Sequence, residues 1–163
     1  EGLALIRQWL PKVVADGSDL EARTHMMAAA TMGATAFQKG LGAIHALSHP
    51  ISAIYDTHHG LTNAVFTPYV LNFNKPVLSD RLTDMARYLD LPSPSFQAIL
   101  DWILALRDEL GIPHSASELR VKFDCLDKLA GMAAVDPTAS TNPIPVDVAD
   151  LRAIYESAID GRL

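Results

Sequence analysis

Cysteine is almost absent from this sequence, which contains a single residue of this type, Cys125. One cysteine excludes an internal disulfide bond and any zinc site built from several thiolates. A chain without disulfides is typical of a reducing compartment, so we expect a cytoplasmic protein. Cys125 lies in an apolar helical pattern with no histidine motif beside it, and a small core residue is its expected role.

Long apolar runs and an excess of basic residues are also missing. No apolar run approaches the ~20 residues that a membrane-spanning helix needs, so no membrane partner is expected. The formal net charge is -6, whereas a protein that binds a phosphate backbone carries a basic face. No nucleic-acid partner is therefore expected. The 163 residues, of which 49% are apolar, suffice for one domain with a sizeable core.

Signals for β-strands are absent as well. The sequence has no sustained alternation of apolar and polar residues and no Asn-Gly or Asp-Gly turn between apolar runs. Apolar residues recur instead at helical spacing, as in Leu3, Ile6, Leu10 and Val14. The pattern predicts an all-α, multi-helix bundle of about seven to nine helices, judged from cap and break signals.

Residues that begin or end helices predict where the first elements lie. Ser18 followed by Glu21 is a capping-box pattern at the start of one helix, and Gly40 is a typical stop for it. Pro50 is expected to interrupt a short helix that begins at Gly42, because proline lacks a backbone donor.

Similar signals predict the later helices. One helix is expected to follow Gly60 and another to cover residues 80–89, and Ser93-Pro94 predicts the cap and first position of the next. Asp147 is expected to begin the last helix, with Gly161 just beyond its end. The sequence also starts in the middle of a helical pattern and without an initiator methionine, so we expect a fragment of a longer protein.

Four of the six histidines fall within fifteen positions, namely His45, His49, His58 and His59. His45 and His49 are four residues apart on an expected helix, so they share a face and could chelate one metal ion. Clustered imidazoles suit zinc, iron, nickel or copper better than magnesium or calcium. The alternative for each is an ordinary core or surface histidine. The spacing indicates a metal or catalytic site and does not identify the reaction.

The region from Gly42 to Asn74 resembles the signature of iron-containing alcohol dehydrogenases. That signature has His-Ala-x-x-His-Pro, a gap, and His-Gly-x-x-Asn-Ala ahead of a proline and a Phe-Asn pair. The matching residues here are His45-Ala46, His49-Pro50, His59-Gly60, Asn63-Ala64, Pro68 and Phe73-Asn74. Further likeness lies in Leu10-Pro11, in residues 15–18, in residues 110–113 and in residues 141–143. Many matched positions make the resemblance specific.

The resemblance implies a fold and a set of metal ligands. Residues 1–163 would form the single all-helical, metal-binding C-terminal domain of a dehydroquinate synthase-like, iron alcohol dehydrogenase two-domain fold. His45 and His59 match the two histidine ligands of this domain, and His49 matches a histidine that handles substrate or protons. Two further ligands, spaced Asp-x-x-x-His, and the glycine-rich nucleotide-binding segment belong to an N-terminal domain that this chain lacks.

The resemblance also implies a metal-dependent, NAD(P)-dependent alcohol dehydrogenase or aldehyde reductase. A divalent metal, Fe²⁺ with Zn²⁺ as the alternative, polarises the alcohol oxygen or the carbonyl for hydride transfer to or from the nicotinamide. NAD or NADP would bind through the N-terminal domain, which is an expected partner beside a small alcohol or aldehyde. A homodimer is compatible with the family. The fragment alone is expected to be inactive, because two of four metal ligands are missing.

Three positions need separate interpretation. His58 stands where relatives commonly have proline, and we expect it either next to the metal ligands or facing solvent. Asn63 is expected either to serve the start of its helix or to line the cofactor or active site. Ile144 follows Asn142-Pro143 where many relatives have arginine, so the sequence departs from the family pattern there.

Two alternative functions stay open at this point. A stand-alone helical metal-binding or interaction module would bind a divalent metal tightly by itself. A related member of the superfamily, such as a glycerol dehydrogenase or a maleylacetate reductase, would share the fold. The residues that select the nucleotide lie outside this chain, and the sequence does not identify the alcohol.

Overall fold

The computed structural model describes residues 1–163 and contains seven α-helices, four short 3-10 helices and no strand. The α-helices are α1 (Gly2–Ala15), α2 (Leu20–Ala36), α3 (Gly42–Tyr55), α4 (His59–Tyr88), α5 (Phe96–Glu109), α6 (Leu126–Ala134) and α7 (Val148–Asp160). The 3-10 helices are η1 (Phe37–Lys39), η2 (Ala116–Leu119), η3 (Phe123–Cys125) and η4 (Pro137–Thr141). The predicted all-α fold is confirmed.

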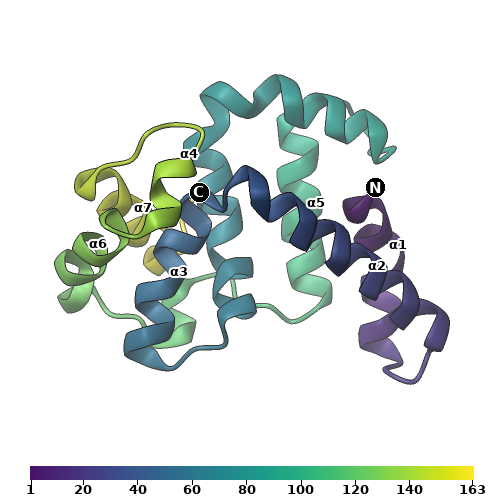
Figure 1. Cartoon of the computed structure of the whole chain (residues 1–163), viewed down its shortest axis with the longest axis horizontal. Coiled ribbons are helices and arrows are strands. Elements are labelled where there is room, and N and C mark those ends of the chain that lie inside the picture. The colour runs from purple at the N-terminus through teal and green to yellow at the C-terminus, as the bar shows by residue number, and fades with distance from the viewer.

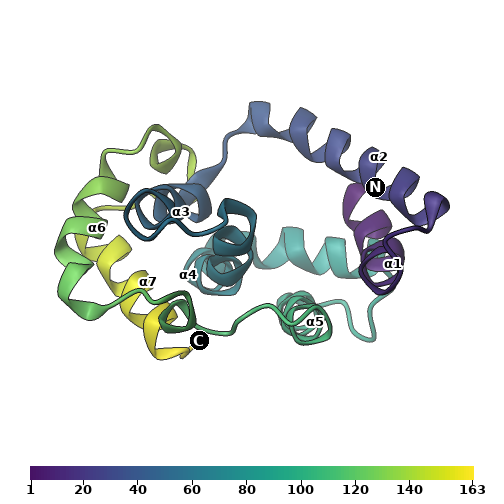
Figure 2. The ribbon, with the colours of Figure 1, turned by 90° about the horizontal axis from the view of Figure 1, so that it is seen from below.

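The helices form two regions at opposite ends of the molecule (Figures 1 and 2). We call α3, the first half of α4, α6, α7 and the short helices η2 and η4 the core lobe. We call the antiparallel pair α1 and α2 the N-terminal arm. The second half of α4 and α5 lie between the two regions (Figure 1).

The core lobe is built around one large apolar cluster of 19 buried residues, contributed by α3, α4, α6, α7 and the η2 region. Phe66 and Tyr155 are fully buried there, and their rings meet edge to face at 5.5 Å. The Tyr155 hydroxyl donates to the backbone carbonyl of Leu47 at 2.6 Å, and burial raises the pKa of this phenol. Each large apolar side chain buried here stabilises the lobe by about 1.5–3 kcal/mol.

A single long helix, α4, replaces two predicted helices. The expected helix after Gly60 and the one over residues 80–89 belong to the same 30-residue element. Pro68 and Pro76 lie inside it and each removes a backbone donor. Figure 1 shows that α4 changes direction along its length, as proline-containing helices do. A second cluster of six buried residues joins the later half of α4 to α5.

The predicted interruption at Pro50 is wrong, because α3 continues through this residue to Tyr55. Pro50 is buried, and its neighbours Leu47 and Ile51 are fully buried in the large cluster. Their burial outweighs the one backbone hydrogen bond that proline removes. Pro11 likewise lies inside a continuous helix, α1.

The predicted cap of α2 is also wrong by one residue. Asp19, not Ser18, is the N-cap, and its carboxylate accepts from the backbone N–H of Ala22 at 2.9 Å. Ser18 instead donates its hydroxyl to Asp16 at 2.6 Å, in the turn that precedes the helix. An aspartate carboxylate is a strong N-cap acceptor, so it outcompetes the neighbouring hydroxyl.

The predicted start of α5 is wrong, whereas both predicted ends of α7 are confirmed. The structure places the α5 cap at Ser95, which accepts from Ala98, so the expected start at Ser93-Pro94 is wrong. Asp147 caps α7 as predicted, with a capping box, and Gly161 ends it in the left-handed conformation. These two ends carry unambiguous local signals.

No helix of the chain combines the length and the apolar character needed to cross a membrane.

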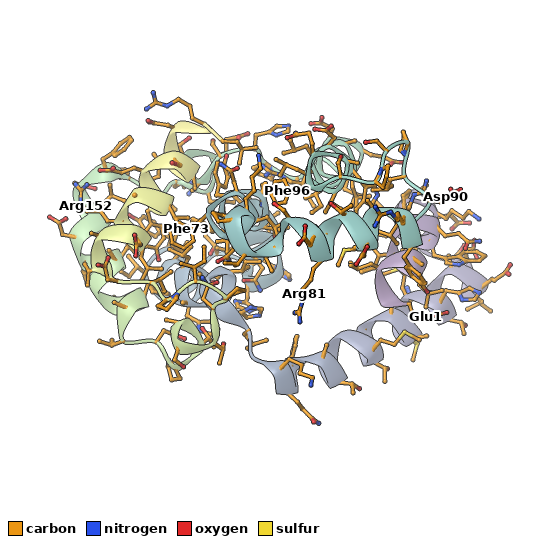
Figure 3. The ribbon with its side chains drawn as sticks, turned by 90° about the horizontal axis from the view of Figure 1, so that it is seen from above. Glu1, Phe73, Arg81, Asp90, Phe96 and Arg152 are labelled. Atoms are coloured by element: carbon orange, nitrogen blue, oxygen red, sulfur yellow. The ribbon has the colours of Figure 1, made fainter.

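The arm packs less completely than the lobe. A groove of about 410 Å³ lies between α1, α4 and α5, and 13 of its 15 lining residues are hydrophobic. Figure 3 shows Arg81 of α4 extending toward α2.

Candidate functional site

Three imidazoles gather where the α3 and α4 helices meet. His45 and His49 lie on α3, and His59 is the first residue of α4. The ring centroids of His45 and His49 are 5.8 Å apart, and each lies 5.2 Å from that of His59. His59 is exposed and the other two are half-buried, so the cluster opens to solvent on one side.

A tight turn brings the third histidine to the other two. Asp56 follows α3 in the left-handed conformation, with φ of 53°, and donates its backbone N–H to the carbonyl of Ser52. Two residues later His58 begins α4 as its N-cap. Aspartate tolerates this conformation better than most residues. The turn therefore places the first residue of α4 beside the face of α3 that carries His45.

Asn63 connects two of the imidazoles. Its side-chain nitrogen lies 3.0 Å from Nε2 of His59 and 3.3 Å from Nε2 of His45. The Ser48 hydroxyl lies between the Asn63 side-chain oxygen and the backbone carbonyl of Ile44, and its one proton serves one of these acceptors at a time. Because an amide nitrogen is a donor only, both Nε2 atoms act as acceptors and converge on one point.

Burial adjusts the protonation of His45. The pKa of its imidazole is lowered, first by burial and then by the charges that His59 and His49 carry when protonated. Its Nδ1 atom is buried and makes no close hydrogen bond, and the nearby backbone of Leu41 only partly opposes the lowering of the pKa. A lowered pKa keeps the ring neutral near neutral pH, so the Nε2 lone pair stays available.

Asp136 holds the third imidazole. Its Oδ2 lies 2.8 Å from Nδ1 of His49, and its Oδ1 accepts from the backbone N–H and hydroxyl of Thr138 at 2.9 and 2.6 Å. Burial raises the pKa of Asp136, but the hydrogen bonds from Thr138 and His49 outweigh it and lower the pKa overall. The group is therefore a carboxylate, an acceptor for both neighbours.

The η4 segment fixes the start of α3. The Thr141 hydroxyl accepts from the backbone N–H of Gly42 at 3.0 Å, and the buried Asn142 side chain accepts from Ala43 at 3.2 Å. Gly40 precedes this contact with φ of 101°, and a Cβ there would lie 2.3 Å from Cβ of Thr141. Only glycine fits this position. It ends η1 and leaves room for the Thr141 side chain.

The predicted site residues are not all brought together. His45, His49, His59 and Asn63 form one cluster, whereas His58 is exposed and its Nδ1 accepts from the backbone N–H of Leu61 at 3.3 Å. Asn63 contacts the imidazoles of His45 and His59, and its role at a cofactor or active site stays a prediction. Asp136 and Ser48 were missed, because their partners are 87 and 15 residues away and no local spacing marks them. Asp136-Pro137 carried only a helix-start signal.

Other predicted residues lie away from the cluster. Cys125 is partly buried at the end of η3 and packs against the large apolar cluster. Ile144 donates its backbone N–H to Asn74, and its carbonyl accepts from Asn142.

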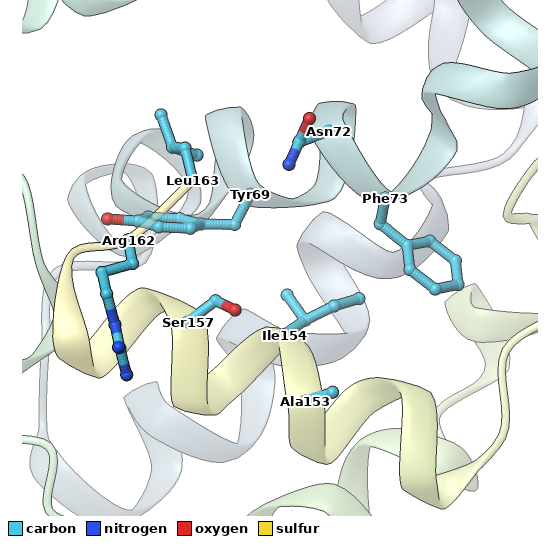
Figure 4. A pocket seen from close by; sticks show the side chains of 8 residues that line it. All are labelled: Tyr69, Asn72, Phe73, Ala153, Ile154, Ser157, Arg162 and Leu163. Atoms are coloured by element: carbon cyan, nitrogen blue, oxygen red, sulfur yellow. The ribbon is translucent and has the colours of Figure 1, made fainter.

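A pocket of about 190 Å³ lies between α4 and α7 (Figure 4), with Tyr69 and Phe73 on one wall and Ile154 on the other. No histidine lines it.

The donor set of the cluster fits part of a transition-metal site. Neutral imidazoles are ligands for Fe²⁺ and Zn²⁺, and the Nε2 atoms of His45 and His59 already converge. No group of three or more His, Cys, Asp or Glu side chains is arranged to hold a metal ion. This chain therefore presents a pair of imidazole donors instead of a complete metal cage.

Known proteins resemble this chain along its whole length. Residues 1–159 match the C-terminal part of the Fe-containing alcohol dehydrogenase family. The 4-hydroxybutyrate dehydrogenase of Cupriavidus necator is 37% identical, over 98% of this chain and 45% of that protein. The NAD-dependent methanol dehydrogenase of Bacillus methanolicus is 34% identical, over 98% of this chain and 44% of that protein.

The solved structures give the same result. A 1,3-propanediol oxidoreductase superposes with a TM-score of 0.92 and 30% identity, over 97% of this chain and 43% of that structure. The chain thus spans less than half the length of these relatives. By sequence and by fold, it belongs to the Fe-containing alcohol dehydrogenase family and corresponds to the C-terminal domain of that family.

Proposed function

We propose that this chain is the metal-binding domain of an NAD(P)-dependent alcohol dehydrogenase or aldehyde reductase. The observation that carries the proposal is the convergence of Nε2 of His45 and Nε2 of His59 on one point, marked by the Asn63 amide. Such a pair of neutral imidazoles can hold a divalent transition metal, with Fe²⁺ favoured by the family and Zn²⁺ as the alternative.

Two histidines of this chain bind the metal, and a third transfers protons. His45 and His59 hold the metal, which when bound supplies a Lewis acid for the substrate oxygen. His49 takes the hydroxyl proton of an alcohol or returns it to a carbonyl, as imidazoles do near neutral pH. Without metal, the Asn63 side-chain nitrogen lies against both Nε2 atoms, and it would give way there to the metal because each Nε2 has one lone pair.

The proposed domain organisation extends beyond this chain. Residues 1–163 form one domain, and a second, N-terminal domain supplies the nucleotide site and the remaining metal ligands. Substrates are small alcohols or aldehydes, since similar proteins act on 4-hydroxybutyrate, methanol and 1,3-propanediol. With half of its metal site elsewhere, the isolated chain is inactive.

The experiment uses the longer protein that carries both domains. His45→Ala and His59→Ala should each lose bound metal, measured by mass spectrometry of the elements, and alcohol-dependent NAD(P)H formation. His114→Ala is the matched control, because His114 pairs with Asp108 on the surface and lies outside the cluster. Full activity and full metal content in either cluster variant would contradict the proposal.

Metal binding by the chain itself separates this function from a stand-alone metal-binding module. Two imidazoles bind a divalent cation weakly in comparison with a complete four-ligand site. We therefore expect titration calorimetry of the 163-residue chain with Zn²⁺ to show weak binding. Tight, stoichiometric binding that His45→Ala abolishes would favour the module instead.

A further inference from the structure

Asp136 and His49 form a side-chain pair that joins segments 87 residues apart. Asp136 begins η4, and His49 lies in the middle of α3. The carboxylate is 14% exposed, and its Oδ2 lies 2.8 Å from Nδ1 of His49. We propose that Asp136 is a positioning residue, which orients the His49 ring and selects its Nδ1–H tautomer for proton transfer. The inference rests on the proposed function.

The hydrogen-bond inventory of Asp136 settles which partner donates. Its Oδ1 accepts twice from Thr138, from the backbone N–H and from the hydroxyl. A carboxylate has only acceptor sites, so the contact with His49 requires a proton on Nδ1. The neutral His49 ring then has its lone pair on Nε2, the nitrogen that does not face Asp136.

Two contacts hold the ring itself. Asp136 binds its Nδ1 edge, and His59 stacks on its face, with ring centroids 5.2 Å apart and planes inclined by 19°. Asp136 is in turn anchored, because η4 ends at Thr141, whose hydroxyl accepts from the start of α3. The carboxylate is therefore held by the same segment that fixes the helix carrying His49.

The step assigned to His49 is a proton transfer. The O–H bond of the substrate breaks, an N–H bond forms on Nε2, and the electron pair stays on the oxygen. The imidazolium that results lies against the Asp136 carboxylate, which stabilises its charge. In the reverse direction the same nitrogen returns the proton. Without Asp136, the ring can rotate or carry its proton on Nε2, where it cannot accept another.

The test compares Asp136→Ala with two matched variants in the protein that carries both domains. Asp147→Ala removes an aspartate N-cap from α7 that contacts no histidine. Asp108→Ala removes an exposed aspartate that pairs with His114, a histidine outside the cluster. We expect Asp136→Ala to lower kcat about 10- to 100-fold with KM and metal content nearly unchanged, and both controls to stay within about twofold of the parent.

A spectroscopic measurement separates positioning from a structural role. With ¹⁵N-labelled histidine, the ring-nitrogen shifts of His49 should report the Nδ1–H tautomer in the parent protein and a shift toward Nε2–H in Asp136→Ala. The double variant with His49→Ala should be no slower than His49→Ala alone, because Asp136 acts through that ring. Asp136→Glu should restore part of kcat, since it keeps a carboxylate.

The outcomes distinguish this inference from the proposed function. An unchanged tautomer and unchanged kcat in Asp136→Ala, or an equal loss of kcat in Asp147→Ala, would overturn the inference while the metal ligands stand. Additive losses in the double variant would overturn it as well. Full metal content and activity in His45→Ala would instead overturn the proposed function, whatever Asp136 does.

Discussion

The core lobe and the N-terminal arm are both helical, yet only the core lobe has a closed interior. The lobe surrounds 19 buried apolar residues, whereas α1 and α2 bury only Trp9, Ala22 and Ala29. In the arm and just after it, Leu20, Met27 and Phe37 remain more than half exposed. The imidazole cluster lies on the lobe, so its geometry depends on helices that are held from several sides.

Histidines in the two regions show what the difference means for function. His25 in the arm stacks on Trp9, with ring centroids 4.3 Å apart, and no other histidine lies near it. His45 and His59 in the lobe instead direct nitrogen atoms at a shared amide. An imidazole packed against an indole contributes apolar surface, while an imidazole with an accessible lone pair can bind a metal ion or accept a proton.

The largest expected contrast comes from matched leucines. Leu151 of α7 is fully buried in the lobe, and Leu20 of α2 is 77% exposed in the arm. Leu151→Ala should lower the free energy of unfolding by about 2–5 kcal/mol, because it leaves a cavity. Leu20→Ala should change it by less than about 0.5 kcal/mol. Urea denaturation of both variants measures this, and equal effects would remove the distinction between the regions.

Two asparagines on α4 sharpen the comparison within one helix. Asn74 is buried and exchanges hydrogen bonds with the Asn142 side chain at 2.9 and 3.0 Å, whereas Asn72 is exposed. Asn74→Ala should cost about 1–3 kcal/mol, since Asn142 is left partly unpaired in the lobe. Asn72→Ala should cost less than about 0.5 kcal/mol. Thermal denaturation that ranks the two variants equally would contradict this role.

The arm has a smaller, local test at its helix cap. Asp19→Ala removes the acceptor for the Ala22 N–H and should destabilise α2 by about 0.5–2 kcal/mol. Ser18→Ala removes only a hydroxyl from the preceding turn and should have little effect on α2. Hydrogen exchange of the α2 amides measures both. Faster exchange in Ser18→Ala than in Asp19→Ala would restore the original sequence-based assignment.

The smallest expected effect is a pH dependence of the lobe. Burial, followed by His59 and His49, lowers the pKa of His45 in the fold, so the unfolded chain takes up a proton at higher pH than the folded chain. This contribution to stability is complete above the unfolded value, about 6.5, and is lost as pH falls from there through the folded pKa. His45→Asn should flatten this part of the stability curve, measured by urea denaturation between pH 8 and 5. An unchanged slope would show that another group causes it.

Local signals in the sequence determined the fold class and several helix ends. Helical periodicity without strand signals predicted the all-α fold, and Asp147 and Gly161 marked α7 correctly. Pro50 misled the prediction, because the burial of Leu47 and Ile51 on either side keeps α3 intact through it. Proline removes one hydrogen bond, a local cost, whereas packing adds contacts from helices that no local pattern reveals.

In the site, too, local spacing predicts some residues, and contacts between distant segments determine others. The spacing of His45, His49 and His59 is local, so the sequence by itself indicated a metal or catalytic cluster and, through the family resemblance, assigned roles within it. Only the tertiary structure decided that Asp136 binds His49, because residues 87 positions apart meet through the packing of η4 on α3. The sequence determines the chemistry of each side chain, but the direction of each lone pair depends on the neighbours that the fold supplies.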